Sequence, residues 1–240
     1  MGSSVDILLL VYDQLGYTKA CIDSVIANTM DQLYRLIIFD NGSVENATKA
    51  YLASIAGKYP QIEMLRNENN EGFVAAVNKG LEYSKSAYTC ILSNDTIVYP
   101  GWLSQMVSVA LKDKSIGLVN PLWEIPKYYR GSREDFFRRV ICRQKGTAIE
   151  TDWARGFCYL VNRRLYNAIG GLDPAFAPAY YDDWDYSVRA QRAGFRCVYA
   201  KGAFVWHHKC VTYESILGRE SLNKALELKA KLFYGRWGRP

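Results

Sequence analysis

In the first 120 residues, short runs rich in leucine and β-branched residues alternate with longer stretches whose apolar residues recur at helical spacing. We expect the short runs to be buried strands, at residues 5–12, 34–39, 62–65, 88–92 and 116–119. We expect the longer stretches to be helices, at residues 18–27, 45–56, 73–83 and 102–111. Four successive strand–helix–strand units predict an α/β fold with a parallel sheet, whose ligands bind beyond the carboxyl ends of the strands.

Polar residues follow each of the first four predicted strands. Asp13 follows the first, Asp40 the second, Asn70 the third, and the pair Asn94-Asp95 the fourth. Residues of these types are also common in turns, so a single loop of this kind would be interpreted as turn chemistry. Four such loops in succession, three of them with an aspartate, favour a polar binding crevice at one edge of the sheet.

The net charge of +6 permits anionic partners such as diphosphates but does not single one out. The chain lacks the phosphate-loop, dinucleotide-binding, nucleophile-elbow and His-Glu-x-x-His motifs, which weighs against ATPases, NAD enzymes, α/β-hydrolases and zincins. Basic residues are spread along the chain with acids between them, so we expect no nucleic-acid partner. Eighteen tyrosines and six tryptophans favour surfaces on which rings such as sugars or bases stack.

The positions of the cysteines and the lengths of the apolar runs indicate the cellular compartment in which we expect the protein. No two of the six cysteines lie within four residues of each other, and several lie in apolar runs, which favours a reduced environment. No apolar run approaches the length that spans a bilayer, and the N-terminal segment lacks the basic region of a signal peptide. We therefore expect a cytoplasmic protein.

Three aspartates crowd one short segment, DDWD at residues 182–185. A helix is expected from residue 184 to 193, so Asp182, Asp183 and Asp185 fall at its first turn, where the helix dipole stabilises negative charge. The alternative interpretation is a general base, because crowded carboxylates raise one another's pKa. One acid is enough for a helix start, so three favour the second interpretation.

His207 and His208 are the only histidines, and they end a predicted strand. Adjacent strand residues point to opposite faces, so at most one of them faces a common site. A neutral imidazole is a common metal ligand, and the Asp95 carboxylate suits Mg²⁺ or Mn²⁺. A surface or core histidine, and an Asx turn before Pro100, are the alternatives that involve no ligand.

The order of motifs from Val5 to about Thr212 resembles the family 2 inverting glycosyltransferases of the GT-A fold, nearest to their rhamnosyltransferase-like members. The motifs are FDNGSVENA, NNEGFVAAVNKGL, LSNDTIVYPGWL, the segment from RGFCYL to DDWDYSVRAQRAGF, and VWHHKCVT. The resemblance implies a Rossmann-like, mostly parallel central sheet flanked by helices, followed by a C-terminal helix. It also implies metal-dependent transfer of a sugar, with inversion, from a UDP- or dTDP-linked donor to a hydroxyl of a saccharide or glycolipid.

The resemblance also implies roles for particular residues. Asp183 is the implied general base, and Asp95 and His207 are the implied ligands of Mn²⁺ or Mg²⁺. His207 is preferred to His208 because Thr212 follows it at the family's spacing of five residues. The implied nucleotide-sugar contacts are Asp13, Asp40, Asn70, Gly72, Asn78, Asn94 and Asp95. The implied acceptor contacts are Trp153, Asp182 and Trp184.

Several positions depart from the family pattern. Asn41 and Asn94 stand where many members have acids, which leaves Asp95 with fewer carboxylate neighbours. Asp182 stands where the family usually has glutamate. Val77 stands where some members carry an arginine near the diphosphate, so we expect another cation to serve there.

We expect a single domain over residues 1–212. Its nucleotide-sugar-binding half is residues 1–120, and its acceptor half is residues 121–212, which include an insertion at 121–150. Within the insertion, Ser132 and Asp135 suit the start of a short helix, and the aromatic part at 123–137 is either a lid or a plain surface loop.

Residues 213–240 are expected to form an amphipathic basic helix and tail. This segment either lies on an acidic membrane surface as a peripheral contact or packs on its own domain or another subunit. For the whole chain, a glycosyltransferase of polysaccharide biosynthesis is the favoured function. A non-catalytic carbohydrate- or nucleotide-binding module on the same fold and a nucleotidyltransferase stay open as alternatives.

Overall fold

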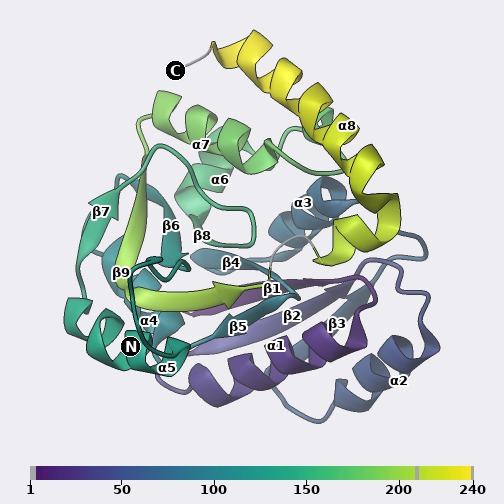
Figure 1. Cartoon of the computed structure of the whole chain (residues 1–240), viewed down its shortest axis with the longest axis horizontal. Helices are drawn as coiled ribbons and strands as arrows, with labels where there is room; N and C mark the ends of the chain where they lie inside the picture. Colours follow the sequence, from purple (N-terminus) through teal and green to yellow (C-terminus); the bar gives the residue numbers. More distant parts are fainter. Residues whose placement is uncertain (1–3, 209–210, 239–240) are drawn as a thin grey trace.

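Four parallel strands form the first half of the central sheet (Figure 1). The computed structural model describes residues 4–208 and 211–238. The four strands, in spatial order, are β3 (Ile62–Arg66), β2 (Tyr34–Asp40), β1 (Val5–Val11) and β4 (Tyr88–Ser93). Each strand ends within one residue of its predicted range, and every residue of β1 is buried. The prediction of parallel strands is confirmed for this half.

The second half of the sheet is mixed. Its strands are β5 (Thr96–Val98), β6 (Ile116–Leu122), β7 (Ala148–Glu150), β8 (Cys158–Asn162) and β9 (Arg196–His207). β8 lies between β4 and β6 and is antiparallel to both, so β6 runs in the same direction as β4 with one reversed strand between them. β9 is parallel to β6 and antiparallel to β5 and β7. The prediction of a mostly parallel central sheet flanked by helices is confirmed. The reversed direction of β8 could not be predicted, because its wholly buried run carries no pattern that reveals strand direction.

Helices cover both faces of the sheet (Figure 1). One face carries α1 (Leu15–Asn28), α2 (Asn46–Ile55) and α4 (Trp102–Ala110). The other carries α3 (Phe73–Tyr83), α6 (Arg163–Ile169) and α7 (Asp182–Arg192). Alternate residues of β1 enter the two layers, Ile7 and Leu9 on the first face and Leu8 and Leu10 on the second. Both layers are apolar, as buried parallel strands require.

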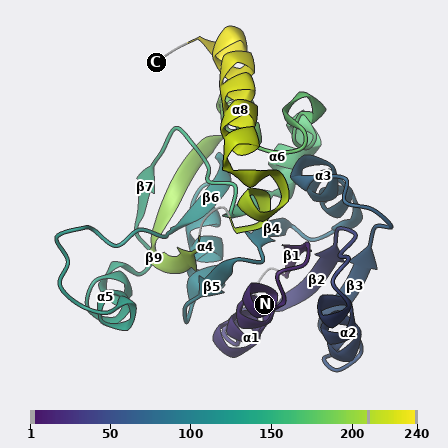
Figure 2. The ribbon, with the colours of Figure 1, turned by 45° about the vertical axis from the view of Figure 1, so that its right-hand side comes forward.

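The insertion at residues 121–150 packs beside β9. Its short helix α5 (Arg133–Arg139) begins where the sequence predicts, because Ser132 Oγ accepts a hydrogen bond from the Asp135 N–H at 3.1 Å. Phe136 is 4% exposed and its ring packs against that of Phe204 in β9. Figure 2 shows α5 and the loop before it projecting to one side of the molecule. Two short 3₁₀ helices are η1 (Ile141–Gln144), which follows α5, and η2 (Pro174–Phe176).

The C-terminal helix α8 (Val211–Trp237) lies beside α7 (Figure 1). Phe233 is 2% exposed, and Trp237 Nε1 donates a hydrogen bond to Asp185 Oδ1 of α7 at 2.9 Å. This end of the helix therefore packs on its own domain, which is one of the two alternatives predicted from the sequence. Over residues 4–208 and 211–238, no helix has a stretch long and apolar enough to cross a membrane.

Candidate active site

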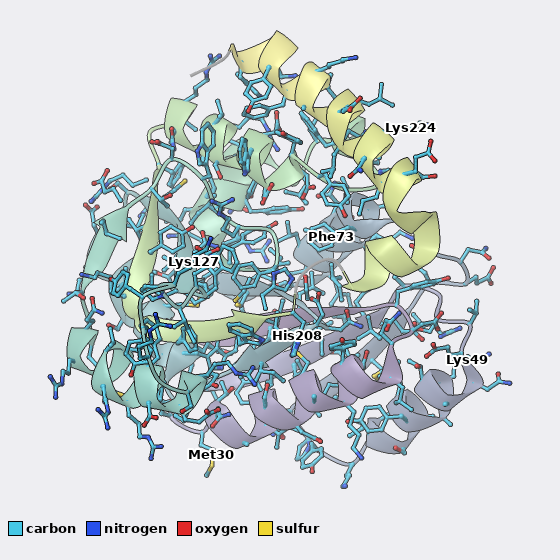
Figure 3. The ribbon with its side chains drawn as sticks, viewed as in Figure 1. Met30, Lys49, Phe73, Lys127, His208 and Lys224 are labelled. Atoms are coloured by element: carbon cyan, nitrogen blue, oxygen red, sulfur yellow. The ribbon has the colours of Figure 1, made fainter. Side chains whose placement is uncertain are left out.

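A cavity of about 510 Å³ opens at the carboxyl ends of β1 and β4. Leu226 of α8 and Phe73, the first residue of α3, also line it. Phe73 is labelled in Figure 3. Seven of the residues predicted to act in the site lie around this cavity: Asn70, Asn94, Asp95, Asp182, Asp183, Trp184 and His207. The structure therefore places Asp95, Asp183 and the imidazole of His207 around one cavity.

Asp95 and His207 meet because β5 and β9 pair in antiparallel register, which places Thr96 opposite His207. His207 Nε2 lies 3.3 Å from Asp95 Oδ2. The imidazole stacks on the Phe157 ring with centroids 4.6 Å apart, which holds it in place. His208 is exposed and does not line the cavity, so the structure favours His207 as the site histidine. The side chain of Thr212 lies outside the described part of the chain.

The donor atoms of Asp95 and His207 fit a divalent ion. Asp95 is 6% exposed, and both side chains line the cavity. Mg²⁺ and similar ions keep positions for water and substrate phosphates, so two protein ligands are enough. No group of three or more His, Cys, Asp or Glu side chains that could hold a metal occurs among the described residues. The Asn94 side chain is engaged elsewhere, because its Nδ2 donates to Thr18 Oγ1 at 2.9 Å.

The three aspartates at the start of α7 have three different environments. Asp183 accepts backbone hydrogen bonds from Gly156 at Oδ2 and from Trp184 at Oδ1, at 2.8 and 2.9 Å. Burial raises its pKa, and these hydrogen bonds oppose the rise. Asp182 is 3% exposed, and its Oδ2 has no hydrogen-bond partner among the described residues. Burial, and then the charge of Asp183, raise the pKa of Asp182 to about 8. Asp185 is fully buried in ion pairs and does not line the cavity.

The raised pKa of Asp182 makes stability depend on pH. Folded wild-type protein retains a proton up to about pH 8 that the unfolded chain releases near pH ~4, so its stability falls as the pH rises through this window. Asp182→Asn carries no charge and is expected to remove this fall. In urea unfolding, the variant should gain at least about 1 kcal/mol relative to wild type between pH 5 and pH 8.

The readout of that experiment is the change with pH, since an amide at this buried position can shift stability equally at every pH. Asp23→Asn, at an exposed position of α1, is the matched control and should show no such change. A difference between Asp182→Asn and wild type that is the same at both pH values would contradict the prediction.

Asp13 and Asp40, implied contacts of the nucleotide, are engaged in holding loops. Asp13 Oδ1 accepts hydrogen bonds from the N–H groups of Val44 and Glu45, both at 2.8 Å. Asp40 accepts the Ser43 N–H at 2.8 Å and forms an ion pair with Arg66. Neither aspartate lines the cavity, although the residues next to them, Tyr12 and Asn41, do. Direct contact of these aspartates with a nucleotide stays a prediction.

Gly72 and Asn78 also have structural partners, and neither lines the cavity. Gly72 has a φ of +83°, and a side chain there would meet Pro178 at 2.7 Å, so glycine is required for close packing. Both polar atoms of the Asn78 amide bond the backbone of Leu172, at 2.8 and 2.7 Å, which ties α3 to the segment before η2. Their contact with a nucleotide likewise stays a prediction.

Aromatic rings form the part of the cavity near α7. Trp184 lines the cavity, and its ring stacks on Trp153, with centroids 4.9 Å apart at 17°. Trp153 does not itself line the cavity and supports Trp184 from behind. Tyr181 lines the cavity and packs edge-on against Trp184. Of the aromatic insertion at 123–137, only Trp123 lines the cavity, so the structure does not place the rest of that segment over it.

The sequence analysis missed one charged residue of the cavity, Arg155. Val77, where an arginine occurs in some similar proteins, is fully buried in the apolar layer beside α3. Arg155 is the only lysine or arginine among the described residues that line the cavity. Arg155 is the first residue of the RGFCYL motif, and this was the one hint in the sequence that it belongs to the site. A single arginine in a loop has no pattern that predicts the direction of its side chain.

The fold and site together define an α/β protein of the GT-A type. The structure of GalNAc-T7 with UDP, GalNAc and Mn²⁺ superposes with a TM-score of 0.72, covers 97% of this chain and 50% of that chain, and is 15% identical. A family model described as glycosyl transferase family 2 matches residues 6–180. The match extends over more than half of the chain, and the chain belongs to this family.

Two curated relatives are similar in sequence. An uncharacterised protein of Sinorhizobium fredii is 25% identical over 226 residues, which are 85% of this chain and 24% of the relative. An N-acetylglucosaminyl-diphospho-decaprenol L-rhamnosyltransferase of Mycobacterium tuberculosis is 24% identical over 208 residues, which are 72% of this chain and 66% of the relative. The chain therefore spans about a quarter and about two thirds of the lengths of these relatives.

Proposed function

We propose that the chain is an inverting glycosyltransferase that moves a sugar from a nucleoside diphosphate sugar to a hydroxyl group of a saccharide or glycolipid. The observation that carries this proposal is the shared cavity, because the Asp95–His207 pair and Asp183 line the same space of about 510 Å³. Such a transfer needs one group that holds the departing diphosphate and another that accepts the proton of the acceptor. Membership of glycosyl transferase family 2 supports the same reaction.

The charges around the cavity support a divalent ion, Mn²⁺ or Mg²⁺, at Asp95 and His207. The described lining residues include three aspartates and one arginine, so an anionic diphosphate needs further positive charge to bind there. When bound, the ion would supply that charge and polarise the phosphate oxygens. The Mn²⁺ named in the GalNAc-T7 structure supports a metal in this fold.

Asp183 takes the proton of the acceptor hydroxyl in this proposal. Its two backbone hydrogen bonds hold the carboxylate in one orientation and leave other lone pairs for the hydroxyl. Burial raises its pKa, which brings its basicity closer to that needed near neutral pH. Asp183 comes from α7, whereas Asp95 and His207 come from the β4–β5 turn and β9.

The rings around Trp184 support a saccharide or the sugar of a glycolipid as the acceptor. Trp184 and Tyr181 present rigid aromatic surface to the cavity, and Trp153 supports Trp184 from behind. Aromatic rings offer a large apolar area with few rotatable bonds, which suits the apolar face of a sugar ring. These rings adjoin Asp183, so an acceptor that packs on them brings its hydroxyl to the base.

A thermal-shift panel of UDP-, dTDP- and GDP-sugars, with and without Mn²⁺, tests the donor side. One class of donor should stabilise the protein, more strongly with Mn²⁺, because stabilisation follows the ratio of ligand concentration to Kd. Asp95→Asn is expected to raise the Kd for that donor in Mn²⁺ at least about tenfold, since a charged contact is lost. Asp23→Asn is the matched control and should bind the donor as wild type does.

Product analysis with the stabilising donor then identifies the reaction. Release of a nucleoside diphosphate together with a glycosylated acceptor, of inverted anomeric configuration, is the expected result. Release of pyrophosphate would identify a nucleotidyltransferase instead. Donor binding without turnover across a range of saccharide and glycolipid acceptors would identify a binding module.

A further inference from the structure

Arg155 lies in the loop between β7 and β8, and hydrogen bonds fix its backbone. Its carbonyl oxygen accepts one hydrogen bond from Asn120 Nδ2 and another from the Cys158 N–H, both at 3.3 Å. These bonds do not involve the side chain, so substitutions of the side chain leave them in place. The position of the loop is therefore set independently of the guanidinium group.

The two residues after Arg155 connect the two parts of the site. Gly156 donates its N–H to Asp183 Oδ2 at 2.8 Å. The Phe157 ring stacks on the imidazole of His207. The loop thus contacts the proposed base with one residue and the Asp95–His207 pair with the next. Arg155 itself lines the cavity to which both parts belong.

The guanidinium group of Arg155 has no anionic partner among the described residues. Its Nε is shielded from solvent and makes no hydrogen bond. Three aspartates line the same cavity, yet none of them lies within the 4.0 Å that defines an ion pair with Arg155. The guanidinium is near enough to Asp183 to lower the pKa of that carboxyl, which burial raises. The cavity is thus lined by a half-buried guanidinium group whose shielded Nε has no hydrogen-bond partner among the described residues.

A shielded N–H group without a hydrogen-bond partner is unfavourable, and an anion in the cavity would accept a hydrogen bond from the Arg155 Nε–H. A guanidinium offers five N–H groups in a planar fork that matches the oxygens of a phosphate. We infer that Arg155 binds a phosphate group of the donor's diphosphate, beside the Asp95–His207 pair. This inference rests on the proposed function.

The same contact stabilises the leaving group. Negative charge on the diphosphate grows as its bond to the sugar breaks, and a fixed cation in a cavity lowers the energy of that charge. Arg155 is therefore expected to act on donor binding and on the rate of transfer, whereas contacts with the base or ribose would act on binding alone.

Calorimetric titration of UDP, dTDP and GDP, each with Mg²⁺, tests the inference without any turnover. For the diphosphate that wild type binds most tightly, Arg155→Met should raise the Kd about 10- to 100-fold, as expected for a lost charge-assisted contact. Binding of the matching nucleoside should change less than about twofold, because it has no phosphate. Arg155→Met keeps the apolar stem and removes the charge, and Arg139→Ala, at an exposed position of α5, is the control.

The outcomes separate this inference from the proposed function. If wild type binds no nucleoside diphosphate, both fail. If wild type binds one and Arg155→Met binds it equally well, the proposed function stands and the inference is overturned. Geranyl diphosphate serves as the probe for a lipid diphosphate. A loss confined to geranyl diphosphate would show that Arg155 serves the acceptor, and it would overturn the inference for the donor.

Discussion

Asp183→Asn is expected to lower the rate of sugar transfer by about 10²–10⁴-fold, the range that a positioned general base contributes. The amide has nearly the shape of the carboxylate but cannot take the proton of an acceptor hydroxyl. The amide oxygen of the variant can still accept one of the two backbone N–H groups that Asp183 accepts, so the start of α7 should remain in place. Initial rates at saturating donor and acceptor measure the effect.

Donor binding by the same variant provides the control. Because Asp183 is assigned to the acceptor, the Kd for the donor should stay within about threefold of wild type, well below the tenfold that corresponds to about 1.4 kcal/mol. Transfer at the wild-type rate would end the assignment of Asp183 as the base. A loss of donor binding as large as the loss of rate would move Asp183 to the donor side of the cavity.

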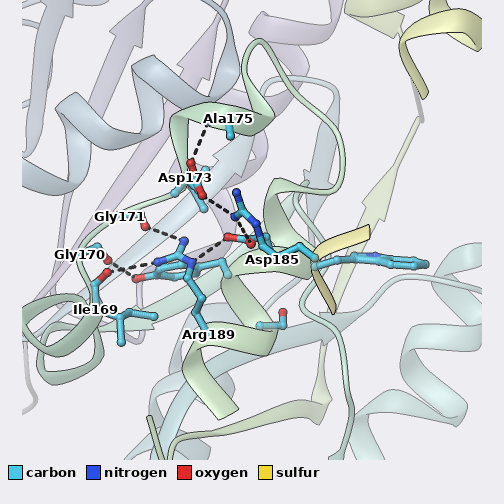
Figure 4. Close-up of polar contacts among 12 residues, drawn as sticks. Ile169, Gly170, Gly171, Asp173, Ala175, Asp185 and Arg189 are labelled. Atoms are coloured by element: carbon cyan, nitrogen blue, oxygen red, sulfur yellow. Dashed lines mark hydrogen bonds and ion pairs between the residues drawn. The ribbon is translucent and has the colours of Figure 1, made fainter. Parts of the chain in front are cut away.

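Asp185→Ala is expected to lower the free energy of unfolding by about 3 kcal/mol, the lower end of the range for breaking a buried ion pair. The Asp185 carboxylate is fully buried and accepts hydrogen bonds from Arg189 Nε at 2.7 Å, Arg236 Nη1 at 3.0 Å and Trp237 Nε1 at 2.9 Å. Figure 4 shows this cluster, in which Arg189 also donates to the carbonyl groups of Ile169 and Gly171. Partial exposure of the arginines places the expectation at the lower end of the range.

Asp173→Ala is the matched comparison in urea unfolding. Asp173 pairs with the same Arg236 at 2.5 Å but is 28% exposed, so its loss should cost about 1 kcal/mol. Limited proteolysis should then cut within α8 faster in Asp185→Ala than in Asp173→Ala, because Asp185 joins α8 to α7. Equal losses of stability in the two variants would show that burial of Asp185 adds nothing to the attachment of α8.

Apart from the three-residue strand β5, which was not predicted, the strands and helices of the first 120 residues could be predicted because each carries its own local pattern. The range predicted for α3 is the observed one, Phe73–Tyr83. Gly72 and Ser84 flank the helix as its caps, and the helical spacing of apolar residues lies between them. The neighbours of β8 could not be predicted in this way. Its residues are all buried, and pairing between β4 and β6 depends on where the chain returns after residue 150. Pairing between strands far apart in the sequence cannot be predicted from the hydrophobic pattern of a short segment.

The positions of site residues could be predicted where those residues lie at the ends of predicted strands. Asp95 lies in the short turn between β4 and β5, and His207 ends β9, so the sheet brings them to one edge. The separate roles of the three acids at residues 182–185 could not be predicted from the sequence. They look alike in sequence, yet Asp183 is held by backbone donors, Asp182 has an unpartnered oxygen, and Asp185 binds α8. These different environments depend on contacts with residues far away in the sequence, such as Gly156 and Trp237. The spacing of residues within the segment cannot predict such contacts.

The pairing of β9 has a consequence for how the protein is made. In the described sheet, β5 and β7 have β9 as their only neighbour, and β9 also carries His207. While the ribosome has produced only the residues that precede β9, neither β5 nor β7 has a strand to pair with. At that stage Asp95 also lacks the neighbouring imidazole of His207. A nascent chain can therefore fold its first parallel strands early while the Asp95–His207 pair is still incomplete. If this pair binds the donor as proposed, unfinished polypeptides would not consume donor in the cell.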